Sequence, residues 1–139
     1  MALLDEVAAK LQTLSVGTIG VDLFKGTMPE TPDACTAVFE YGGVAPTMGF
    51  GSAGIFYESP SVQIVCRGVK DDYSTPRSLA ETAYEGLASV EASTLSVSGG
   101  TSAFYHWIHP NQPPFQMQRD VNGRVYIAFN CLVEKELSA

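Results

Sequence analysis

A two-residue alternation of side-chain character runs through two long segments and constrains the fold more than any other feature. In residues 61–69 and 124–135, every second residue is apolar over most of the segment. Because successive side chains of a strand point to opposite faces, each segment predicts a strand with one buried face. The buried side chains predicted in the second segment are Val125, Ile127, Phe129, Cys131 and Val133. Asn122-Gly123 directly before it favours a type I′ hairpin turn.

Two other segments repeat their apolar side chains at helical spacing. Leucine, valine and alanine recur at this spacing across residues 3–14, which predicts an amphipathic helix. A second apolar stripe crosses residues 79–88. Thr75 and Pro76 before this stripe suit the N-cap and first turn of a helix, which we expect to end near Val90.

The order of the predicted elements indicates the fold class. Shorter strand-like segments are predicted at residues 19–23, 34–41, 94–97 and 101–109. With the two helices and the two long strands, this order predicts an α+β fold, a mainly antiparallel β-sheet with two α-helices packed on one face. The 139 residues suffice for one hydrophobic core, so we expect a single domain over residues 1–139.

Residues 42–54 form a glycine-rich segment that does not match a regular element. Glycine offers no side chain to bury and loses much conformational entropy on folding. We therefore predict a flexible loop over about residues 42–56. Four apolar residues on or beside it are our candidate assembly interface: Met48, Phe50, Ile55 and Phe56. Deleting residues 45–52 is expected to spare folding and to abolish the joining step in which this interface takes part.

The charge balance and the cysteines restrict the class of protein. Eight basic and fifteen acidic side chains give a formal net charge of −7, which argues against a protein that holds nucleic acid through its phosphates. Cys35, Cys66 and Cys131 are far apart and lie in apolar surroundings, which predicts buried, reduced thiols. The opening residues do not resemble a signal peptide, and an apolar run of about 20 residues is missing. We expect a soluble protein made inside the cell, without membrane contact.

Two sequence motifs invite a chemical interpretation that their context does not support. Residues 49–54 match GxGxxG, but strand-like residues follow, whereas a dinucleotide site needs a helix there. His106 and His109 form HxxH on a predicted strand, where residues three apart point to opposite faces and cannot share a metal ion. The sequence therefore predicts no cofactor and no metal.

Other polar and aromatic residues also favour structural roles. Asp71 and Asp72 precede a predicted helix and are interpreted as caps rather than as an acid–base pair. The aromatic residues of segment 104–107 lack the basic neighbours of a nucleic-acid platform and are expected in the core or at an interface. No catalytic residue is predicted, and we expect the protein not to be an enzyme.

Three segments together resemble the family of small minor capsid and tail terminator proteins of phages with long, non-contractile tails. The first is residues 59–68 (SPSVQIVCRG), similar to a central strand of that family, and the second is residues 78–87 (SLAETAYEGL), similar to the helix that follows it. The third comprises residues 113–115 and 119–126, similar to the turn into the last strand. The resemblance covers roughly residues 55–135.

The resemblance implies a structural virion protein at the head–tail junction, assembled in the host bacterial cytoplasm. It implies a homo-oligomeric ring, usually of six subunits, that caps the major tail tube protein, stops its polymerisation and joins the tail to the head connector. Genomic DNA would pass through the lumen without specific binding. A head–tail stopper or a minor capsid protein of the neck is the alternative, and a small nucleotide-binding protein or enzyme is a third hypothesis.

Overall fold

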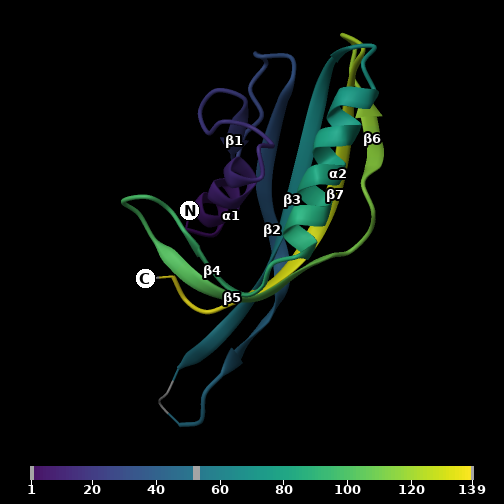
Figure 1. Cartoon of the computed structure of the whole chain (residues 1–139). Coiled ribbons are helices and arrows are strands. Elements are labelled where there is room, and N and C mark those ends of the chain that lie inside the picture. The colour runs from purple at the N-terminus through teal and green to yellow at the C-terminus, as the bar shows by residue number, and fades with distance from the viewer. Residues whose placement is uncertain (1, 52–53, 139) are drawn as a thin grey trace.

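The computed structural model describes residues 2–51 and 54–138, and it contains a mixed seven-stranded sheet with two helices on one face (Figure 1). The elements are α1 (Ala2–Thr13), β1 (Leu23–Lys25), β2 (Cys35–Met48), β3 (Ile55–Lys70), α2 (Ser74–Ala88), β4 (Glu91–Ser96), β5 (Ser102–Pro110), β6 (Phe115–Arg119) and β7 (Arg124–Lys135). The strand order is β1-β2-β3-β7-β5-β4, with β6 also paired to β7. β1 and β2 are parallel, and the other pairs are antiparallel. The predicted α+β class is confirmed.

The core lies between the sheet and the two helices. All five apolar side chains predicted for the buried face of β7 are inaccessible to solvent. Ala80 and Ala83 of α2 are small and buried, which lets the helix lie close to the sheet. Burial of each large apolar side chain in this core stabilises the folded state by about 1.5–3 kcal/mol. Gly86 gives room to Leu14 at the end of α1, because a Cβ there would lie 2.4 Å from Leu14 Cδ1.

The prediction of a loop over residues 42–56 is wrong for most of that range. β2 continues to Met48 and β3 begins at Ile55, so the glycine-rich segment is largely a β-hairpin. The pairing of β2 with β3 shifts register between Tyr41 and Val44, and a Cβ at Gly43 would lie 2.0 Å from the carbonyl oxygen of Ser59. Glycine is thus required here by a bulge and a close backbone approach, not by a loop.

Two element boundaries near the helices differ from those predicted. Residues 20–22 form a turn instead of part of a strand, because the backbone N–H groups of Val21, Asp22 and Leu23 all donate to the carbonyl of Thr18, and Ile19 makes only an isolated bridge to Leu23. α2 begins at Ser74, so Thr75, which was predicted as the N-cap before the helix, already lies within its first turn.

The turn before β7 is also of a different type. β6 was not predicted as a strand, and it joins β7 through a four-residue loop, residues 120–123, in which Gly123 has a positive φ of 76°. Asn122 does not have a positive φ, so the predicted type I′ turn is wrong. A carboxylate oxygen of Asp120 accepts hydrogen bonds from the backbone N–H groups of Asn122 and Arg124, at 2.9 and 3.0 Å, and this determines the loop conformation.

Candidate assembly interface

The β2–β3 hairpin extends beyond the rest of the sheet (Figure 1). We call residues 41–57 of this hairpin the arm. The arm contains no Asp, Glu, Lys, Arg or His in a chain whose net charge is −7. β1 pairs with β2 only as far as Val38, so among the described residues the outer backbone edge of β2 pairs with no strand along the arm. Pro46 is compatible with such an edge because it has no N–H to donate.

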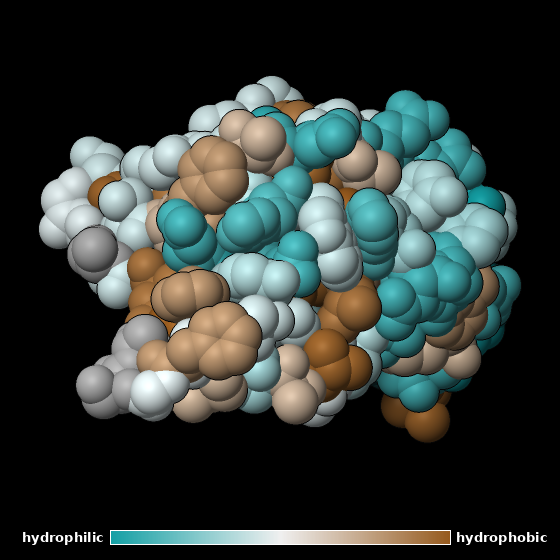
Figure 2. Space-filling model, turned by 90° about the horizontal axis from the view of Figure 1, so that it is seen from below, coloured by the Kyte–Doolittle hydropathy of each residue, from teal (hydrophilic) through white to brown (hydrophobic). Residues whose placement is uncertain are grey.

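The four predicted interface residues lie at the outer end of the arm and are exposed. Met48 and Ile55 are register partners and are 60% and 39% exposed. Phe50 lies in the connecting turn and is 98% exposed, while Phe56 is 57% exposed. Viewed from the end of the molecule that carries the arm, apolar side chains gather toward one side and hydrophilic ones toward the other (Figure 2). Exposed apolar side chains in such a group are typical of a contact surface.

The base of the arm is anchored to β5 and β7. The ring of Tyr57 lies 5.0 Å from that of His106, and Lys135 Nζ donates a 3.2 Å hydrogen bond to Glu58. Tyr41 accepts a weak hydrogen bond of 3.4 Å from Asn111 Nδ2. The arm is therefore attached to the body at its base, and no side-chain hydrogen bond or ion pair joins the described part of residues 42–56 to another element.

Lys135 also belongs to a buried polar cluster that connects the two ends of the chain. Its Nζ donates to Ser138 Oγ at 2.9 Å and lies 3.9 Å from Glu6 Oε1. Glu6, from α1, accepts hydrogen bonds from Tyr105, Thr101 and Ser138. Glu6 and Lys135 are both almost completely buried, so each compensates for a charge that would otherwise be costly to bury. Desolvation and the neighbouring Glu6 raise the pKa of Tyr105, which stays a hydrogen-bond donor.

A shallow groove runs along the opposite face of the sheet from the helices. One part of it has a volume of about 310 Å³, and an adjoining part of about 220 Å³ shares Phe39 and Gln63 with the first. We call these two hollows together the groove. Its main lining residues are Met28, Phe39, Tyr41, Gln63, Val65, Met117, Gln118, Tyr126 and Asn130. The alternation within each strand predicts which side chains share this face of the sheet. It does not predict which strands lie next to one another, because that depends on the pairing order.

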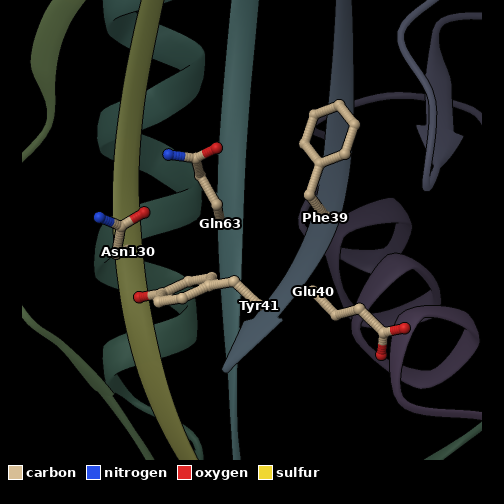
Figure 3. A pocket seen from close by; sticks show the side chains of 5 residues that line it. All are labelled: Phe39, Glu40, Tyr41, Gln63 and Asn130. Carbon is tan, nitrogen blue, oxygen red and sulfur yellow. The ribbon is translucent and has the colours of Figure 1, made fainter. Parts of the chain in front are cut away.

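The lower part of the groove contains polar groups with unused hydrogen-bonding capacity. Tyr41, Gln63 and Asn130 project from neighbouring strands toward the same space, whereas Glu40 points away from it (Figure 3). Asn130 Oδ1 is buried and has no hydrogen-bond partner among the described residues. A buried acceptor of this kind is normally satisfied, so the lower part of the groove is polar and has hydrogen-bonding capacity that its own chain does not fill.

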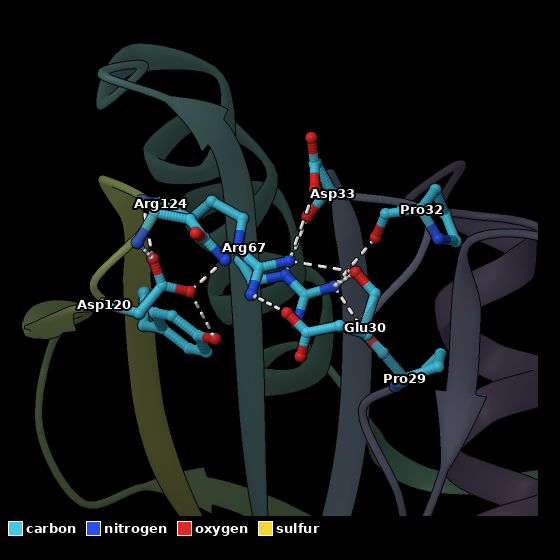
Figure 4. A network of polar contacts seen from close by, with 9 residues as sticks. Pro29, Glu30, Pro32, Asp33, Arg67, Asp120 and Arg124 are labelled. Carbon is cyan, nitrogen blue, oxygen red and sulfur yellow. Dashed lines mark hydrogen bonds and ion pairs between the residues drawn. The ribbon is translucent and has the colours of Figure 1, made fainter.

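Two buried arginines hold the 26–34 loop, which carries Met28, at the edge of the groove (Figure 4). Arg67 donates to the carbonyl oxygens of Pro29, Pro32 and Asp33 at 2.6–2.8 Å. Sequence patterns did not reveal this role, because the acceptors are backbone atoms of a distant loop.

The second arginine, Arg124, forms ion pairs with Glu30, Asp33 and Asp120. Desolvation of Asp120 opposes ionisation, but hydrogen bonds from Arg124 and Tyr126 outweigh it and lower the pKa of the carboxyl to about 2. The carboxylate therefore stays ionised and keeps the loop attached at neutral pH.

The GxGxxG and HxxH motifs both lie in surroundings that differ from those of a cofactor or metal site. The GxGxxG segment lies at the hairpin turn and is followed by β3, not by a helix; its Ser52 and Ala53 lie outside the described residues. His106 packs against Tyr57 and Phe104, while His109 stacks on Trp107 at 4.1 Å, so the two imidazoles have separate environments. Among the described residues no group of three potential metal ligands is found.

The acidic pair and the cysteines also have structural roles. Hydrogen bonding with the side chain and backbone of Thr75 lowers the pKa of Asp72, whose carboxylate accepts a 3.2 Å bond from the Thr75 backbone N–H. Asp72 thus binds the first turn of α2 from the position before the N-cap residue Tyr73, whereas Asp71, also predicted as a cap, pairs with Arg119 instead. The three cysteines are buried, as predicted. Desolvation raises the pKa of Cys66 and of Cys131 to about 12, so these thiols stay protonated.

Comparison with known proteins identifies a related family. The family model described as bacteriophage tail terminator protein matches residues 10–136, which is most of the chain and includes the arm and the groove. No curated protein matches the chain. Within the described residues, none of the helices is both long and apolar enough to span a membrane.

Proposed function

Because the chain belongs to the family of bacteriophage tail terminator proteins, a structural role in the phage tail follows, and we propose how it is carried out. In this proposal the protein forms a homo-oligomeric ring, of six subunits as the family resemblance implies. The ring caps the last ring of the major tail tube protein, stops polymerisation and presents its other side to the head connector. It thereby resides at the head–tail junction and works without catalysis.

The exposed arm is the observation that carries this proposal. Phe50 is almost fully exposed, and Met48 and Phe56 are more than half exposed, on a hairpin that extends from the body. An isolated soluble domain gains nothing from apolar groups held in water. Their burial against another protein would contribute about 1.5–3 kcal/mol for each side chain that is fully covered. The arm is therefore a suitable place for contacts within the tail.

The acidic charge of the chain supports the proposed passage of DNA. Each subunit has a formal charge of −7, and in this proposal some of the acidic side chains line the lumen of the ring. Like charge prevents a moving polyanion from adhering to the wall. Lysine substitutions at acids that face the lumen are expected to slow DNA ejection, and an unchanged ejection rate would count against this arrangement.

The role of the arm can be tested in a phage whose own copy of the gene is inactive. Tails and joined particles would be counted by electron microscopy after complementation with the parent protein or with Met48→Ser/Phe50→Ser. We expect the variant to fold normally, because exposed side chains change stability by only about 0.5 kcal/mol, and to leave tails unjoined to heads. Val121→Ser is the control, since Val121 is fully exposed outside the arm. Normal joining by the double variant would exclude the arm from the mechanism.

Co-purification distinguishes the alternative positions in the virion. A terminator is expected to bind the tail tube protein, whereas a head–tail stopper or a minor capsid protein would bind head components instead. The third hypothesis, a nucleotide-binding protein, predicts a higher melting temperature in the presence of nucleotide.

A further inference from the structure

We propose that the groove of one copy receives the outer end of the arm of the next copy, so that the ring closes through arm-in-groove contacts. This inference rests on the ring proposed above and identifies the surfaces that form it. The outer end of the arm and the upper part of the groove lie toward opposite ends of the molecule: the arm extends at one end, and β6, which carries Met117, lies toward the other (Figure 1). The lower part of the groove begins at the base of the arm, where Tyr41 lines it. A contact between two different surfaces is head-to-tail, and such contacts generate rings when the rotation closes.

Electrostatics favours a second copy as the occupant of the groove. Identical chains that each carry −7 repel one another, so their contact is most favourable where neither surface is charged. The arm has no ionisable acid or base from 42 to 56, and the groove lining is uncharged except for Glu40 at its rim. Arg67 beneath the groove is buried and already donates to four carbonyl oxygens of the 26–34 loop. A basic partner protein would therefore find almost no acidic side chains to pair with on the arm or in the groove.

The chemistry of the two surfaces is complementary. The upper part of the groove presents Met28, Phe39 and Met117, which suit an apolar side chain such as Phe50. Methionine adapts its shape to aromatic neighbours. The lower part presents the buried, unpartnered Oδ1 of Asn130, and the outer edge of β2 has backbone N–H groups that pair with no strand of their own chain. One docked arm can therefore bury its aromatic tip in the upper part of the groove and offer its unpaired strand edge to the polar lower part.

Disulfide cross-linking tests this contact in assembled tails. Phe50→Cys/Met117→Cys would be incorporated into tails by complementation, oxidised, and separated without reductant. Because Phe50 and Met117 lie toward opposite ends of one chain, a bond between them joins two copies. The native thiols do not interfere, since all three are buried. We expect a ladder of covalent multimers that ends at the ring size, whereas the control Phe50→Cys/Val121→Cys stays mostly monomeric.

The possible outcomes separate this inference from the proposed function. Tails of normal length that contain the double variant but yield no ladder above the control would overturn the arm-in-groove contact and leave the terminator role intact. Absence of the chain from purified tails would overturn the ring and this contact together. If Met117→Cys impairs folding, Phe50→Cys/Gln118→Cys repeats the test, because Gln118 also lines the groove and is exposed. An equal ladder in the Val121 control would likewise overturn the contact.

Discussion

Substitution of Lys135 by methionine is expected to destabilise the fold far more than loss of any surface ion pair. Lys135 and Glu6 are 1% and 0% exposed, respectively. Methionine retains most of the volume of the lysine stem but removes the ammonium group. Glu6 is then left with a buried charge that no cation balances, although Tyr105, Thr101 and Ser138 still donate to it. Glu58 is 40% exposed and can return to water at little cost.

The structure indicates the size of this effect. Removal of one partner of a buried ion pair costs about 3–5 kcal/mol, because the remaining charge stays buried. The distance of 3.9 Å between Lys135 Nζ and Glu6 Oε1, and the hydrogen bonds that remain on Glu6, favour the lower limit of about 3 kcal/mol. With an entropy of unfolding of about 0.3 kcal/mol/K for a chain of this length, the melting temperature falls by roughly 10 °C.

Urea unfolding of four proteins would measure the coupling: the parent, Lys135→Met, Glu6→Gln and the double variant. Glutamine removes the buried charge and still accepts hydrogen bonds, so we expect the double variant to regain about 2 kcal/mol. Lys25→Met is the matched control. Its Nζ lies only 2.7 Å from Asp5, but both side chains are more than a quarter exposed, and the expected loss is below about 1 kcal/mol.

Two results would refute this reasoning. If Lys135→Met cost no more than Lys25→Met, burial would not be what determines the strength of these pairs. If the losses from Glu6→Gln and Lys135→Met were additive, the two groups would not compensate for each other's charge.

Three further predictions follow from local geometry. Gly43→Ala places a Cβ against the Ser59 carbonyl oxygen, so we expect a loss of about 1–3 kcal/mol in urea unfolding and faster hydrogen exchange in the arm. The pKa of Asp120 is lowered to about 2, so the stability from its bonds with Arg124 is complete above about pH 4 and is lost as the pH falls toward 2. Asp120→Asn should therefore flatten the pH dependence of the urea midpoint in that range. The buried Cys66 thiol, whose pKa is raised to about 12, should react with a thiol reagent at pH 8 only after unfolding, and rapid labelling of the native protein would contradict its burial.

The spacing of apolar residues was enough to predict the helices and strands in which these residues recur regularly. Spacing alone predicted the buried faces of β3 and β7 and the apolar stripes of α1 and α2. In a regular helix or strand, the number of residues between two side chains determines whether they point to the same side. The four apolar residues from Met48 to Phe56 were chosen from the sequence as a candidate interface; the structure shows that they are exposed, and their role in assembly stays a prediction. The family resemblance was confirmed by the match over residues 10–136.

The hairpin arm and the groove depended on tertiary structure. Gly43 has little strand preference of its own, yet it lies in β2, where the pairing with β3 brings the backbone of Ser59 too close for any residue other than glycine. The groove joins side chains from the 26–34 loop and four strands, and only the pairing order brings those segments together. Periodicity is a property of neighbours along the chain, whereas strand pairing and close backbone approach depend on residues far apart in it.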